Sequence, residues 1–257
     1  MKVAKILGAA LALALSAPAW SIGRLADLAV FDRNEGRSLP VHWHEGRAWV
    51  VGKPGNEYQV TVRSRGGEDL LAVMSVDGVN VVTGETASPQ QSGYVLSPWR
   101  ALEVKGWRKS LERTAAFYFT ELPDSYAART GRPENVGVIG VALFQRKRSE
   151  PPVSIAPLSR QGASQAADAA GSSGSARAEA QAPLAERDAK LGTGHGRSET
   201  SHARQVEFER ASNAPAETIA IYYDSYRNLV ARGVIRDAPP LDPAPHPFPG
   251  FVPDPRG

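Results

Sequence analysis

Apolar and polar residues alternate over short stretches between residues 23 and 148, and turn residues separate these stretches. Residues 58–62 alternate in this way, which predicts a β-strand with one buried face. Asp77-Gly78 stands between two apolar runs, and this dipeptide favours a tight hairpin. The run 136–144 is apolar on both faces, which predicts a central strand. We therefore predict a mainly β fold, an antiparallel β-sandwich that spans residues 23–148.

The composition of the chain changes after residue 148, and three further segments follow. Residues 149–190 are rich in Ala, Ser, Gly and Pro and predict a disordered linker. Residues 191–236 predict a small strand–helix module, with the strand at 205–210, and residues 237–257 predict an extended Pro-rich tail. The apolar positions of the expected helix share one face, which would dock on the sandwich or, alternatively, pair with the same helix of a second molecule. They are Ile219, Tyr222, Tyr223, Tyr226 and Val230.

The chain begins with the three-part pattern of a secretory signal peptide. Lys2 and Lys5 form a positive start, an apolar run covers residues 6–15, and small residues suited to cleavage follow. This run is too short to span a bilayer, and no later stretch approaches ~18 consecutive apolar residues. We expect residues 1–21 to be removed and the mature protein to be soluble, not membrane-spanning, and periplasmic or secreted.

The amino-acid composition excludes several kinds of functional site. The chain of 257 residues contains no cysteine, which excludes disulfides, zinc–thiolate sites, iron–sulfur clusters and a cysteine nucleophile. It has 30 basic and 27 acidic side chains, and the loss of Lys2 and Lys5 with the signal peptide would leave 28 against 27. Such a balanced charge disfavours a nucleic-acid partner. We expect no cofactor.

Three histidines are the candidates for metal or acid–base chemistry. His42 and His44 would share one face of a strand, with Trp43 on the core side, and two imidazoles are half of a metal site. A third ligand is missing, so we favour two solvated histidines on an edge hairpin. His195 lies among glycines in GTGHGR, which lacks the ending of a phosphate loop and favours a flexible entry to a strand.

An enzyme is the alternative interpretation. A metal-dependent or acyl-transfer hydrolase would use His42, His44 or His195. The sequence contains neither a Gly-x-Ser-x-Gly elbow nor a His-Glu-x-x-His motif, so we assign no catalytic residue.

A basic, aromatic-rich stretch supplies the candidate binding residues. Trp99, Trp107, Arg108 and Lys109 would together face an acidic envelope polymer, such as lipopolysaccharide or a cell-surface glycan, or a protein partner. In the other interpretation the tryptophans are buried and the charges beside them are solvated.

Several segments carry a resemblance to a known family. VDGVNVVTGE, QSGYVLSPWRALEVKGWRKS, FYFTELPDSYAARTG and NVGVIGVALF, with LGTGHGR, FERAS and IYYDSYRNLVARGVI, resemble a family of exported bacterial proteins without an established function. The resemblance covers about residues 47–144 and 191–235. It implies that these two parts belong together, and it implies no activity, ligand or catalytic residue. We predict a non-catalytic envelope protein with a binding or structural role.

Overall fold

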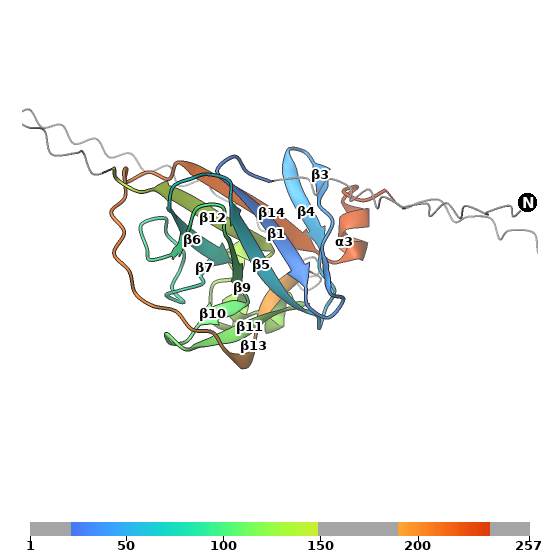
Figure 1. Cartoon of the computed structure of the whole chain (residues 1–257). Helices are drawn as coiled ribbons and strands as arrows, with labels where there is room; N and C mark the ends of the chain where they lie inside the picture. The colour runs from blue at the N-terminus through green and yellow to red at the C-terminus, as the bar shows by residue number, and fades with distance from the viewer. Residues whose placement is uncertain (1–21, 149–189, 237–257) are drawn as a thin grey trace, which may run out of the picture.

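The structure, a computed structural model, describes residues 22–148 and 190–236. The described chain forms two β-sheets whose inner faces share one hydrophobic core (Figure 1). The predicted mainly β, two-sheet fold is therefore confirmed. The predicted signal peptide (1–21), the predicted linker except for Lys190, and the predicted tail (237–257) lie outside the described residues. Within the described ranges, no helix is long and apolar enough to cross a membrane.

Sheet A is antiparallel throughout and is built around β5 and β11. β5 pairs with β1 on one side and with β9 and β11 on the other, and β11 also pairs with β10 and β13. Its seven strands are β1 (Ala26–Asp32), β2 (Arg37–Ser38), β5 (Glu57–Ser64), β9 (Ala101–Val104), β10 (Gly106–Arg108), β11 (Arg113–Glu121) and β13 (Leu191–Thr200).

Sheet B has the order β3-β4-β14-β12-β6-β7, and β8 also pairs with β6. The pair β4–β14 is parallel, and the other pairs are antiparallel. Its strands are β3 (His42–His44), β4 (Arg47–Val51), β6 (Leu70–Val76), β7 (Val79–Asn80), β8 (Tyr94–Leu96), β12 (Val138–Gln145) and β14 (Glu217–Asp224).

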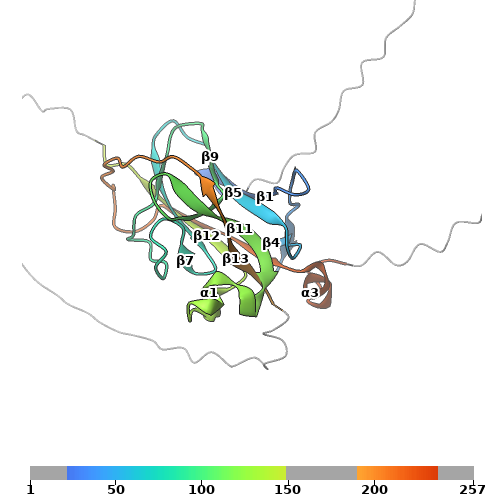
Figure 2. The ribbon, with the colours of Figure 1, turned by 90° about the horizontal axis from the view of Figure 1, so that it is seen from below.

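Four short helical segments complete the described chain. They are η1 (Leu122–Asp124), α1 (Tyr126–Arg129), η2 (Pro133–Asn135) and α3 (Tyr226–Ala231). The Ser125 hydroxyl accepts a hydrogen bond from the backbone N–H of Ala128 and caps α1. Figure 2 shows α1 beside β13 and α3 at a separate place.

Local patterns placed several strands correctly. β12 lies between β14 and β6, as its apolar faces predict for a central strand. β6 and β7 form the predicted hairpin, in which Asp77 and Gly78 have φ values of 54° and 72°. Both values lie in the left-handed region that Asp and Gly tolerate better than most residues. Tyr58, Val60 and Val62 point into the core from β5.

The segment after residue 191 completes both sheets. This part of the chain does contain strands followed by a helix, but their predicted positions were wrong. Most of the apolar residues that were expected on one helix face lie in the strand β14. Ile219, Ile221 and Tyr223 alternate into the core, and β4 and β12 satisfy the backbone on both sides. β-Branched and aromatic residues suit a pleated strand with such neighbours.

The expected strand over 205–210 was also wrong. Residues 201–210, called the strap below, run from the end of β13 in sheet A to sheet B (orange, left in Figure 1). One isolated bridge, Arg146↔Arg210, joins the strap to the end of β12. Val206 and Phe208 alternate with charged neighbours as in a strand, but the described chain offers the strap no continuous partner.

Candidate ligand site

A polar cluster is buried between the two sheets. Asp77 is fully buried in the β6–β7 turn, where its carboxylate accepts hydrogen bonds from Gly137 N (2.9 Å), Thr193 N (2.7 Å) and the Tyr223 hydroxyl. The Thr193 hydroxyl lies 2.6 Å from the hydroxyls of both Tyr58 and Tyr223. The cluster thus joins a turn of sheet B to strands of both sheets.

Burial dominates the electrostatics of this cluster. Removal from water raises the pKa of Asp77 to about 6, although its three hydrogen bonds act in the opposite direction. Burial and then the charge of Asp77 raise the pKa values of Tyr58 and Tyr223 well above the ordinary value. None of these side chains lines the grooves described below. We assign the cluster a structural role.

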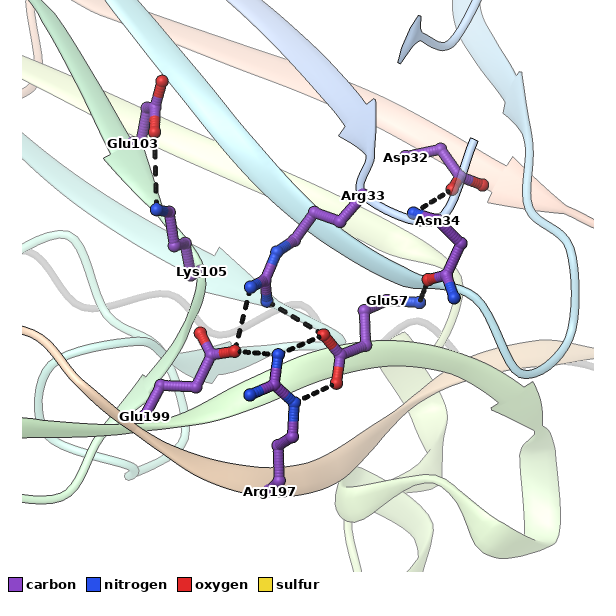
Figure 3. A network of polar contacts seen from close by, with 8 residues as sticks. All are labelled: Asp32, Arg33, Asn34, Glu57, Glu103, Lys105, Arg197 and Glu199. Atoms are coloured by element: carbon purple, nitrogen blue, oxygen red, sulfur yellow. Dashed lines mark hydrogen bonds and ion pairs between the residues drawn. The ribbon is translucent and has the colours of Figure 1, made fainter. Parts of the chain in front are cut away.

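Four charged side chains form a second network, on sheet A (Figure 3). Arg33 lies 3.2 Å from the Glu57 carboxylate and 2.9 Å from that of Glu199. Arg197 donates to Glu57 at 2.7 Å and also pairs with Glu199. The hydrogen bond from Arg197, and then the charge of Arg33, lower the pKa of Glu57 against the effect of burial. Two cations and two anions pair with one another, so this network ties β13 to β5 rather than presenting unbalanced charge.

Open space lies on both sides of the strap. The β8 groove, of about 750 Å³, lies between the strap and the segment 90–95. The β9 groove, of about 480 Å³, lies between the strap and the segment 102–105. Six residues line both grooves, which therefore meet at the strap. They are Tyr94, Val95, Arg108, Ala203, Arg204 and Val206.

Arginines hold the two ends of the strap. Arg108 donates to the carbonyl and the hydroxyl of Ser201, at 2.8 and 2.9 Å, and to the Tyr94 hydroxyl at 2.8 Å. At the other end Arg210 donates to the carbonyls of Pro89 and Gln91, at 2.9 and 2.7 Å. The strap is therefore bonded to β10 at one end and to the loop before β8 at the other.

The middle of the strap is open. Residues 204–207 are all exposed and make no hydrogen bond to the described part of the chain. Val206 is 50% exposed, and Leu111, which also lines the β8 groove, is 48% exposed. Both side chains therefore leave apolar surface accessible in the β8 groove.

Both grooves carry an excess of positive charge. The β8 groove is lined by three arginines and one glutamate, and the β9 groove by four basic and two acidic side chains. Arg204 lines both grooves, is exposed, and forms no ion pair with the described residues. The site is therefore suited to a ligand that combines negative charge with apolar groups.

The four predicted binding residues do not come together. Arg108 alone lines the grooves. Trp99 is 66% exposed in the turn between β8 and β9, and Lys109 is exposed outside the groove linings. Trp107 is buried, and its ring meets that of Phe117 edge-on, with the ring centroids 4.8 Å apart. The alternative interpretation, that the tryptophans are buried, is therefore correct for Trp107.

The paired histidines lie on β3, the edge strand of sheet B. His42 and His44 are half-buried, whereas Trp43 is 51% exposed, so the expectation that Trp43 faces the core was wrong. β3 is an edge strand of three residues, and Trp43 is outside the core cluster. Nε2 of His44 lies 3.8 Å from the Glu45 carboxylate. In the two described ranges no three His, Asp or Glu side chains gather into a metal site.

His195 lies in a β-strand, next to a register shift in the ladder, rather than in a flexible entry segment. The glycine-rich residues 191–200 form β13 and pair with β11. A Cβ atom at Gly194 would lie 2.1 Å from the ring of Tyr118, so glycine here lets the tyrosine lie across the strand. Burial lowers the pKa of His195. Because His195 is in sheet A, it is in a different sheet from His42 and His44.

Sequence patterns did not reveal the strap site. Its residues come from several strands, chiefly β8, β9 and β10, and from the strap, and its local signals were only Arg108 and the alternation of Val206 and Phe208 with charges. Comparisons with protein-family models, with curated proteins and with solved structures give no match to this chain.

Proposed function

We propose that the protein is a non-catalytic binding protein of the bacterial cell envelope that holds an anionic ligand in the grooves beside the strap. The observation that carries this proposal is the position of Arg204, an exposed arginine that lines both grooves without an ion-pair partner in the described chain. A guanidinium group in this setting suits bidentate contact with a carboxylate or phosphate.

The apolar lining supports the same proposal. Leu111 and Val206 place exposed apolar surface next to the arginines of the β8 groove. A ligand that covered these side chains would gain about 25 cal/mol for each Å² removed from water. In this proposal the arginines orient the ligand through its negative charge, and the apolar contacts contribute most of the binding free energy. The hydrolase alternative receives no comparable support, because its histidines are divided between the two sheets.

Export is the second part of the proposal. It rests on the positive start, the apolar run and the small residues near positions 17–21. Mass spectrometry of the mature protein from the periplasm or medium should find an N-terminus created near residues 19–21. A mature protein that retained Met1 would contradict export.

A charge reversal tests the binding site. The probes are poly-L-glutamate and polygalacturonate, titrated into the mature protein in a calorimeter at low ionic strength, where charge contacts are least screened. Arg204→Glu should weaken binding of the better probe at least about tenfold, equal to about 1.4 kcal/mol. Arg227→Glu is the matched control, because Arg227 is exposed on α3, on the opposite side of the molecule from the strap (Figure 1). Absence of saturable binding, or equal losses in the two variants, would contradict the proposal.

A further inference from the structure

Two strand edges border the grooves without a strand partner in the described residues. β8 pairs with β6 through Leu70↔Leu96 and its two neighbouring pairs, and no strand pairs with its other edge. β9 likewise pairs only with β5. Residues of both strands line the grooves. Such edges present backbone N–H and C=O groups that can receive another strand.

The strap supplies a second unpaired backbone beside these edges. Its ends are bonded, since Ala203 N donates to Leu111 O at 2.7 Å and Lys147 N donates to Glu209 O at 2.9 Å. Residues 204–207, between these bonds, have no backbone hydrogen bond to the described chain. The grooves are thus flanked by free backbone on the strand side and on the strap side.

The side chains around the grooves suit an extended peptide. Successive side chains of a strand point to opposite faces, so an alternating peptide presents one row of charged and one row of apolar groups. Val95, Val206 and Leu111 offer contacts for an apolar row, and the arginines offer contacts for acidic groups. Main-chain hydrogen bonds with alternating side-chain contacts are the features of binding by strand addition.

We propose that the ligand is an extended acidic segment of a protein partner, which adds as a β-strand along the free edge of β8 next to the strap. This proposal rests on the proposed function, because it names the ligand class of the same site. An acidic glycan offers carboxylates but no regular row of peptide N–H and C=O groups, so the free backbones favour a peptide over a polysaccharide.

Backbone methylation of a probe peptide tests strand addition. The probe is an acetylated and amidated octapeptide of four Glu-Val repeats, and the two matched probes carry N-methyl groups on all valines or on all glutamates. Each set of methyl groups removes the N–H donors from one edge of the strand and leaves the charge unchanged. Calorimetric titration into the mature protein should show at least tenfold weaker binding for both methylated peptides, and weaker binding of polygalacturonate than of the parent peptide.

The outcomes separate this inference from the proposed function. Equal affinity of the parent and methylated peptides, or tighter binding of polygalacturonate that depends on Arg204, would overturn strand addition and leave an anionic-ligand site in place. Absence of binding of every probe would overturn both proposals.

Discussion

Asp77 combines a turn conformation with a buried charge. Its positive φ suits the tight turn between β6 and β7, while its carboxylate points into the core and accepts hydrogen bonds from Gly137, Thr193 and Tyr223. The Asp-Gly pattern predicted the turn. The buried carboxylate could not be predicted, because two of its donors come from residues 116 and 146 positions later in the chain.

The pKa of Asp77 predicts a specific pH dependence of stability. Its folded pKa of about 6 is above the ordinary value of 3.8, so the native state holds the proton more tightly than the unfolded chain does. The stabilising contribution is complete below about pH 3.8 and is lost as the pH rises through about 6, a change of roughly 3 kcal/mol. Urea unfolding of wild type and Asp77→Asn at pH 4, 5, 6 and 7 measures this difference.

Asp77→Asn is the suitable comparison because asparagine also tolerates the positive φ and does not titrate. The variant should be less stable by about 1–3 kcal/mol at pH 5, since one buried donor loses its acceptor. The wild type should lose stability relative to the variant between pH 4 and 7. Parallel pH profiles of the two proteins would show that Asp77 does not titrate in this range.

At the scale of elements, β14 shows how one pattern fits two structures. Ile219 and Tyr223 are four residues apart, a spacing compatible with one helix face and also with one strand face. In the structure they point into the core with Ile221, while Tyr222 lies on the other face against Trp49, with ring centroids 5.1 Å apart. Whether this segment forms a strand or a helix depends on its partners β4 and β12. These strands are remote in sequence, so a local periodicity carries no information about them. By contrast, β12 and the β6–β7 hairpin were predictable because their signals are local.

Two alanine substitutions test this assignment of β14. Ile221→Ala should lower the free energy of unfolding by about 2–5 kcal/mol, because Ile221 is fully buried in the strand. Tyr226→Ala should cost less than about 1 kcal/mol, because Tyr226 is 49% exposed on α3. In the predicted helix stripe Tyr226 would be buried and Ile221 would lie outside the stripe. A larger loss for Tyr226→Ala in urea unfolding would therefore contradict the strand.

At the scale of the whole molecule, the late part of the chain closes the fold and creates the site together. β13 and β14 each complete a sheet, and the strap, which belongs to the connection between them, lines the grooves together with residues of β8 and β9. Arg108 and its partner Ser201 are 93 residues apart. This distance explains why the sequence identified Arg108 as a candidate but could not place it in a groove with Arg204.

Hydrogen–deuterium exchange of the mature protein, with and without saturating poly-L-glutamate, tests the ligand site most directly. Bound ligand should slow amide exchange in the strap (201–210), in residues 90–95 and in residues 102–105, because these segments line the two grooves. Exchange in the β3–β4 hairpin and in α3 should stay the same, since neither lines a groove. Protection centred on residues 42–49, or no change in the strap under saturating ligand, would contradict a binding site beside the strap.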